Sequence, residues 1–224
     1  QNLVIHPFDQ TFSKLSAEEF VQTVLVDQFH IQKIIIGHDH RFGKNRTADI
    51  NDLIAYGQQH GFEVEQISVQ EIDAVSISST KIRTALMEGN MALANEFLGY
   101  EYFLTGTVAK GKQLGRTIGF PTANLQIKKN YKLIPKKGVY VVQSIINQKT
   151  VFGMMNIGFN PTVQGEKRTI EVHFFDFDLD IYNRHIRVAI LQRIRSEEKF
   201  ESVELLKIQL GKDKDFSIQY IQNL

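Results

Sequence analysis

The segment GKQLGRTIGF combines glycines and cations in a pattern that suits phosphate binding. Gly111, Gly115 and Gly119 alternate with Lys112 and Arg116. Glycines let a loop backbone approach phosphates closely, and the cations can cover the charge. The pattern therefore predicts a phosphate-binding loop, and a mobile surface loop is the alternative.

The next segment, FPTANL, places a hydroxyl and a carboxamide close together. Pro121 fixes the backbone just before Thr122, and Asn124 follows two residues later. Mg²⁺ takes a few protein oxygens and completes its shell with phosphates and water. Thr122 and Asn124 are therefore candidate magnesium ligands, although an Asx-type turn would use the same residues.

A carboxylate lies within the strand-like segment RTIEVHFFDFDLDIY. Alternation puts Glu171 on the same face as His173, Phe175, Phe177 and Leu179, which predicts that it points with aromatic residues and away from bulk water. A carboxylate in that setting needs a partner or a chemical role. Glu171 is a candidate proton acceptor, and a hydrogen-bonded core glutamate is the alternative.

A polar loop, HDHRFGKNR, follows the apolar segment KIIIG. Ligands bind at the carboxyl ends of parallel strands in open α/β sheets. Asp39, Arg41 and Arg46 are therefore candidates for holding a nucleotide. His38 and His40 also permit a metal site, but two nearby histidines without further ligands are more typical of loop polar groups.

The segment ISSTKIR predicts a helix start that can bind an anion. Ser78, Ser79 and Thr80 supply hydroxyls beside unpaired N–H groups, and the helix dipole favours negative charge there. Arg83 adds a planar fork suited to phosphate. An ordinary N-cap with a surface arginine is the alternative.

Strands and helices alternate over residues 1–99, which predicts a parallel α/β domain. Ser16 and Glu19 form an expected capping box. The expected strands are residues 3–8, 33–36 and 63–67, and the expected helices are residues 16–29, 48–60 and 79–86. The first residues already read as a strand without a preceding Met, so we expect a chain cut at its N-terminus.

The pattern changes over residues 100–224, where short Val-, Ile- and Phe-rich segments are separated by Gly, Asn and Pro. The expected strands are residues 102–109, 139–146, 150–155, 169–177 and 185–194. Their spacing predicts a closed or nearly closed antiparallel barrel. Phe200, Val203, Leu206 and Leu210 lie at helical intervals after Ser196 and predict a terminal helix packed on that barrel.

The composition excludes several classes of protein. With 42% hydrophobic and 23% charged residues, the chain is typical of ordinary globular domains. The absence of cysteine excludes disulfides and thiolate zinc sites. A net charge of +1 gives no bulk attraction to nucleic acid or membranes, and no apolar run is long enough to predict a membrane helix. We expect a cytoplasmic protein that binds small molecules.

The motifs together resemble a known family. GKQLGRTIGFPTANL, KKGVY, MMNIGFNPTV, IEVHFFDFDLDIY and RIRSEEKF resemble the riboflavin kinase domain in order and spacing. IIIGHDHRFGKNR and ISSTKIR resemble the later half of the FMN adenylyltransferase domain of bacterial bifunctional enzymes, also called FAD synthetases. His40 and Ala48 depart from that family's usual residues, and its early nucleotidyl-transfer motif has no counterpart here.

The resemblance implies a fold and an activity. Residues 1–99 would be an incomplete nucleotidyltransferase-type parallel α/β domain, and residues 100–224 a riboflavin kinase β-barrel with a C-terminal helix. ATP and Mg²⁺ would bind the Gly-rich loop with Thr122 and Asn124, while Glu171 would accept the proton of the riboflavin hydroxyl. Arg195 would lie on the flavin side, with Glu198 and Phe200. The chain would make FMN, and adenylylation to FAD would need the full-length parent; a non-catalytic flavin-nucleotide-binding fragment is the alternative.

Overall fold

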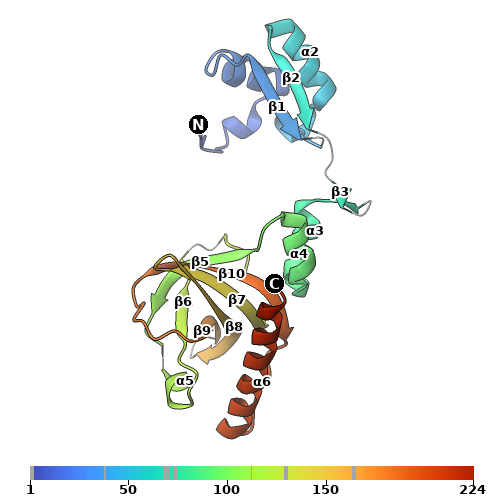
Figure 1. The fold of residues 1–224 in the computed structure, drawn as a ribbon. Coiled ribbons are helices and arrows are strands. Elements are labelled where there is room, and N and C mark those ends of the chain that lie inside the picture. Colours follow the sequence, from blue (N-terminus) through green and yellow to red (C-terminus); the bar gives the residue numbers. More distant parts are fainter. Residues whose placement is uncertain are drawn as a thin grey trace. The chain divides into compact units, whose positions relative to one another are not determined.

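The protein is described by a computed structural model that covers residues 3–37, 39–67, 71–72, 75–111, 113–128, 131–162 and 165–224. The chain forms two compact units, one up to Ser76 and one from Ile77 to Leu224 (Figure 1). Each unit has its own hydrophobic core. Within the described residues, no helix is long and apolar enough to cross a membrane.

The first unit contains a two-stranded parallel sheet, β1 (Lys33–Gly37) and β2 (Glu63–Ile67), connected by α2 (Ile50–His60). Before β1 lie η1 (Phe12–Lys14), α1 (Ala17–Phe20) and the π-helical η2 (Val21–Val26), and η3 (Lys44–Arg46) precedes α2. The short strands β3 (Glu71–Ile72) and β4 (Val75–Ser76) pair antiparallel. The expected capping box at Ser16 and Glu19 is present.

The strand expected at residues 3–8 does not form, and this prediction was wrong. Leu3, Ile5 and Phe8 are 85%, 82% and 79% exposed, so the apolar alternation has no core to face. Within the described residues, β1 pairs only with β2, and no third strand joins the sheet. The ring of His6 instead stacks on Phe12 at 4.4 Å.

The second unit is built around a closed six-stranded barrel in the order β10-β5-β6-β9-β8-β7, with antiparallel pairing throughout. Its strands are β5 (Phe103–Ala109), β6 (Ala123–Gln126), β7 (Gly138–Ile146), β8 (Lys149–Thr162), β9 (Gly165–Phe174) and β10 (His185–Arg195). The expected barrel is confirmed. β6 was not anticipated, because the prediction treated PTAN as a site rather than as part of a strand.

A helical hairpin packs on the barrel in this unit. It consists of α3 (Ser79–Glu88) and α4 (Met91–Leu98). The Asn95 side chain donates to the carbonyl of Ile190 at 3.0 Å and accepts from the Tyr102 N–H at 2.8 Å, which ties α4 to β10 and β5. The structural boundary therefore falls after Ser76, so both helices lie with the barrel.

The last helix, α6 (Val203–Gln222), begins at the N-cap Ser202 and runs along the outside of the barrel (Figure 1). On the outer barrel face, Val139, Met154 and Phe175 form a small apolar cluster against which Leu210 and Ile221 of α6 pack. The inner faces of the same strands fill the main core, with Met155, Ile157, Ile170, Val172 and Phe174 among the buried residues.

Candidate functional site between the barrel wall and the last helix

The outer faces of three adjacent strands bring polar groups together. In the register of the barrel, Glu171 of β9 lies opposite Asn124 of β6 on one side and Asn156 of β8 on the other. Residues directly opposite in adjacent strands have Cβ atoms about 4.5–5.5 Å apart. Since Ile170 and Val172 fill the barrel core, half-buried Glu171 faces outward.

Thr122 lies beside this carboxylate just before β6 begins. Its hydroxyl donates to Glu171 Oε2 at 3.4 Å, which is at the long end of the hydrogen-bond range. The structure thus brings together Thr122, Asn124 and Glu171, which sequence reasoning had placed in one site. His173 shares the face of Glu171 as expected, but the expected alternation ends with the strand, because Leu179 is 57% exposed.

The Gly-rich loop, which runs from Gly111 to Gly119, lies against the cluster of Thr122, Asn124 and Glu171. Helix α5 (Leu114–Thr117) forms the middle of this loop. A side chain at Gly111 would collide with the Asn124 carboxamide, and one at Gly115 would collide with the Phe120 carbonyl. The Phe120 N–H donates to the Gly115 carbonyl at 2.8 Å. Glycine at these two positions therefore permits the loop to fold tightly against β6.

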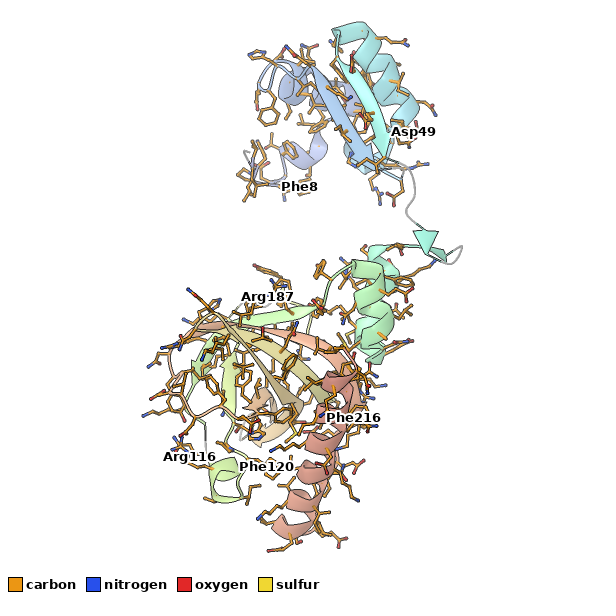
Figure 2. The ribbon with its side chains drawn as sticks, viewed as in Figure 1. Phe8, Asp49, Arg116, Phe120, Arg187 and Phe216 are labelled. Carbon is orange, nitrogen blue, oxygen red and sulfur yellow. The ribbon has the colours of Figure 1, made fainter. Side chains whose placement is uncertain are left out.

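The other predicted residues of this loop lie at its surface. Arg116 and Gly119 are exposed, and Figure 2 shows Arg116 and Phe120 at the α5 end of the barrel. Lys112 lies outside the described residues. The loop therefore presents one described cation, Arg116, to a ligand on its outer side.

His173 fixes the position of the FPTAN segment. Its Nδ1 lies 2.8 Å from the Pro121 carbonyl, and a carbonyl only accepts, so Nδ1 carries the proton. Burial lowers the pKa of His173, the bond to Pro121 opposes that shift, and the nearby charge of Lys214 lowers the pKa further. The ring is therefore neutral at pH 7 and anchors the backbone just before Thr122.

Two cavities meet at Thr122. One, of about 410 Å³, lies between the barrel wall, the Gly-rich loop and α6. Apolar side chains dominate its lining: Ile118, Phe120, Val139, Met154, Phe200, Val203, Leu206 and Leu210. Its polar lining includes Thr122, Asn156, Glu171 and His173.

The second cavity, of about 540 Å³, lies on the other side of the FPTAN segment. Arg116, Pro121 and Thr122 line it, together with the loop after β9, which contributes Asp178 and Tyr182. Lys110 lies 5.6 Å from the centre of the Tyr182 ring. Thr122 lines both cavities, so a ligand in the second cavity can also reach it.

Arg195 lines the first cavity, but its guanidinium is already paired. It forms a bidentate ion pair with Asp213 of α6, with Nη2 2.8 Å from Oδ2 and Nε 2.9 Å from Oδ1. Glu198 and Phe200, which the resemblance placed on the flavin side, line the same cavity.

Sequence reasoning did not single out Asn156 or Asp213 as site residues. Asn156 is part of the motif MMNIGFNPTV, so only its role was missed. Asp213 stands three residues after Leu210 on the apolar stripe of the last helix, and an acid on such a stripe is a signal that can be read from the sequence.

The predicted residues of the first unit remain exposed. Asp39 is exposed, and Arg41 lines a cavity of about 310 Å³ with His40 and Arg46. The apolar part of its lining includes Phe8, Phe12 and Phe20. His38 lies outside the described residues, and the described part of the chain contains no group of three or more His, Asp or Glu that could hold a metal.

The segment ISSTKIR starts α3 as expected. Ser78 is the N-cap, and its hydroxyl accepts from the Lys81 N–H at 3.3 Å. Ser79, Thr80 and Arg83 are exposed on the first turns of the helix. The ordinary capping role is therefore present, and it leaves these three side chains accessible to a ligand.

Comparison with known proteins assigns both parts of the chain. Residues 98–221 match the family model described as riboflavin kinase, and residues 1–81 match the one described as FAD synthetase. The bifunctional riboflavin kinase/FMN adenylyltransferase of Escherichia coli K12 is 39% identical over 92% of this chain and 66% of its own length. The Haemophilus influenzae protein of the same name is 39% identical over 94% of this chain and 68% of its own length.

A solved structure from Streptococcus pneumoniae, titled a macrolide-efflux protein, has 36% identity and a TM-score of 0.85 over 94% of this chain and 67% of its own. The chain spans about two thirds of the length of the relatives that it matches. The second unit is a closed barrel that brings Thr122, Asn124 and Glu171 together beside a Gly-rich loop. Together with the match of residues 98–221 to the riboflavin kinase model, these features define a transferase domain of the riboflavin kinase class. The chain belongs to the bifunctional riboflavin kinase/FMN adenylyltransferase family.

Proposed function

We propose that the barrel unit transfers the γ-phosphoryl group of ATP to the 5′-hydroxyl of riboflavin and so forms FMN. The ribityl oxygen forms a bond to the γ-phosphorus, and the bond from that phosphorus to the β–γ bridging oxygen breaks. ADP leaves with the electron pair of the broken bond. The hydroxyl proton passes to the carboxylate of Glu171.

The observation that carries this proposal is the position of Thr122. It lines both cavities, and its hydroxyl lies 3.4 Å from Glu171 Oε2, so substrates bound in the two cavities can meet beside this carboxylate. The largely apolar cavity beside α6 suits the isoalloxazine ring. The cavity lined by Arg116 suits the phosphates of ATP, because a guanidinium binds phosphate oxygens in a fork.

The corner also fits a magnesium ion. Thr122 and Asn124 offer oxygen donors, which Mg²⁺ prefers, and ATP would supply phosphate oxygens for the rest of the shell. When bound with ATP, Mg²⁺ neutralises charge on the β- and γ-phosphates. Asn124 is held against Gly111, so the metal-side residues and the Gly-rich loop are positioned together.

The chain's own residues then perform three tasks. Arg116 and the loop backbone bind phosphate, His173 holds the Pro121 carbonyl and hence the start of β6, and Glu171 accepts the proton. Phosphoryl transfer depends mainly on positioning and electrostatic stabilisation.

The test is product formation. The protein is incubated with riboflavin, ATP and Mg²⁺, and riboflavin and FMN are separated by chromatography. We expect FMN to accumulate with matching ADP, and omission of ATP to abolish it. Binding of riboflavin without any FMN would instead support the alternative of a non-catalytic flavin-binding module.

We also infer that the first unit, up to Ser76, is a nucleotide-binding part of an FMN adenylyltransferase, as the match of residues 1–81 supports. Within that unit, Asp39 and Arg41 would contact a nucleotide. Within the second unit, Ser78, Ser79, Thr80 and Arg83 at the start of α3 would bind a phosphate group. In separate ATP titrations, Arg41→Ala and Arg83→Ala should each weaken ATP binding at the unit that carries the residue, without changing FMN formation. Unchanged ATP binding in both variants would remove these residues from the proposal.

A further inference from the structure

The last helix carries an acid on its buried face. Leu206, Leu210, Asp213 and Ser217 follow one another at spacings that put them on one side of α6. Asp213 is 1% exposed and Ser217 is fully buried. Removing a carboxylate from water is costly unless it is paired and hydrogen-bonded, so Asp213 requires a specific partner.

That partner is Arg195 at the end of β10. Asp213 accepts from Arg195 Nε and Nη2, and its Oδ1 also accepts from Gln209 Nε2 at 2.9 Å. Both carboxylate oxygens are therefore satisfied. The pair joins α6 to β10, and its Arg195 also lines the cavity beside α6.

Arg195 is held in one orientation by this arrangement. Its Nη1 donates to the Ser196 carbonyl at 2.9 Å, and the guanidinium lies 5.7 Å from the centre of the Phe200 ring. A guanidinium has five N–H groups. The bonds described above use one on each nitrogen. Among the residues that the structure describes, one N–H on Nη1 and one on Nη2 therefore remain for a ligand in the cavity.

We propose that Asp213 is a positioning residue for flavin recognition: it holds Arg195 so that the two remaining N–H groups serve acceptor atoms of the isoalloxazine ring. This inference rests on the proposed function, since it takes riboflavin as the occupant of the cavity beside α6. The ring offers carbonyl oxygens and unprotonated nitrogens, which are acceptors. Asp213 also balances the charge of Arg195, so this side of the cavity offers two N–H donors while the Arg195–Asp213 pair carries no net charge.

The test compares Asp213→Asn with Ile221→Ala. Asn keeps the shape of Asp213 but cannot accept the bidentate fork as a carboxylate does. Ile221 packs α6 on the barrel outside the flavin cavity, so its truncation weakens the helix contact without touching Arg195. Riboflavin binding is measured alone by quenching of flavin fluorescence, and thermal melts report the stability of both variants.

We expect Asp213→Asn to raise the riboflavin Kd about tenfold or more, the effect of one charge-assisted hydrogen bond. The KM for riboflavin should rise while the KM for ATP stays unchanged, because ATP is assigned to the other cavity. Ile221→Ala should lower the Tm with an unchanged riboflavin Kd. If Asp213→Asn raised the KM values for riboflavin and ATP equally, or if Ile221→Ala raised the riboflavin Kd as much as Asp213→Asn does, Asp213 would have a purely structural role and the proposal would be overturned.

Arg195→Lys provides a second variant in case Asp213→Asn does not fold. Lysine keeps the charge beside Asp213 but cannot bind it bidentately and also offer two fixed donors. A folded Arg195→Lys protein with normal riboflavin affinity would overturn the inference. A wild-type protein that does not bind riboflavin at all would instead refute the proposed function, so the two failures are distinguishable.

Discussion

Glu171→Gln isolates the proposed proton transfer from binding and folding. Glutamine has the shape of glutamate and its carbonyl oxygen can still accept the Thr122 hydroxyl, but it cannot take the proton that leaves the ribityl oxygen. We therefore expect a folded protein that binds riboflavin and ATP and reacts slowly.

The structure limits the cost of this change in stability. Among the described residues, the hydrogen bond on the carboxylate is the 3.4 Å contact from Thr122, and Glu171 is only half-buried. We expect the free energy of unfolding to change by less than about 0.5 kcal/mol, which is a shift in Tm of about 2 °C or less. General-base catalysis contributes roughly 10²- to 10⁴-fold, so the barrier should rise by about 2.7–5.5 kcal/mol.

The assay is single-turnover formation of FMN with riboflavin and Mg·ATP at saturation, beside a thermal melt and a flavin titration. Glu204→Gln makes the same chemical change on the exposed first turn of α6, outside both cavities, and should keep the wild-type rate. A Glu171→Gln protein that saturates with both ligands and reacts at a near-normal rate would remove Glu171 from the mechanism. Loss of stability or flavin affinity with an unchanged rate would show a structural carboxylate.

Three further changes test the surroundings of this residue. Thr122→Ala or Asn124→Ala should raise the KM for Mg·ATP about tenfold with little change in the riboflavin KM, because each removes one oxygen on the phosphate side; unchanged ATP kinetics in both would refute the metal assignment. Gly115→Ala should lower the free energy of unfolding by about 1–3 kcal/mol, because its Cβ meets a backbone carbonyl across the loop, whereas Gly211→Ala in α6 meets nothing and should be neutral or stabilising. Burial lowers the pKa of His173, so as the pH falls the unfolded chain binds the proton first, and the stability of the fold decreases as the pH drops through about 6.5. The Tm of His173→Asn should therefore fall less than the wild-type Tm between pH 7.5 and 5.5. An equal fall in both proteins would contradict this.

Local patterns were sufficient to predict much of the fold. Ser16 and Glu19 predicted the start of α1, and the alternation around Glu171 predicted that this carboxylate shares a face with His173. The strand predicted at residues 3–8 was wrong because alternation says nothing about whether a partner strand exists. β6 was missed because the prediction treated PTAN as a binding site and not as part of a strand.

The site residues also differ in how far local sequence could predict them. Thr122 and Asn124 are close in sequence, so one motif was enough to find them. Their approach to Glu171 depends on the order of strands in the barrel, which the motif alone does not specify. The pairing of Arg195 with Asp213 depends on how α6 lies on β10, so local spacing identified an unusual acid but not its partner.

The most direct test of the account is an experimental structure of the protein with riboflavin, Mg²⁺ and a non-hydrolysable ATP analogue. We expect the isoalloxazine ring between the barrel wall and α6, the phosphates on the Arg116 side of Thr122, and the ribityl 5′-oxygen within hydrogen-bond reach of Glu171. A flavin bound elsewhere, or a 5′-oxygen directed away from Glu171 with both ligands in place, would contradict it.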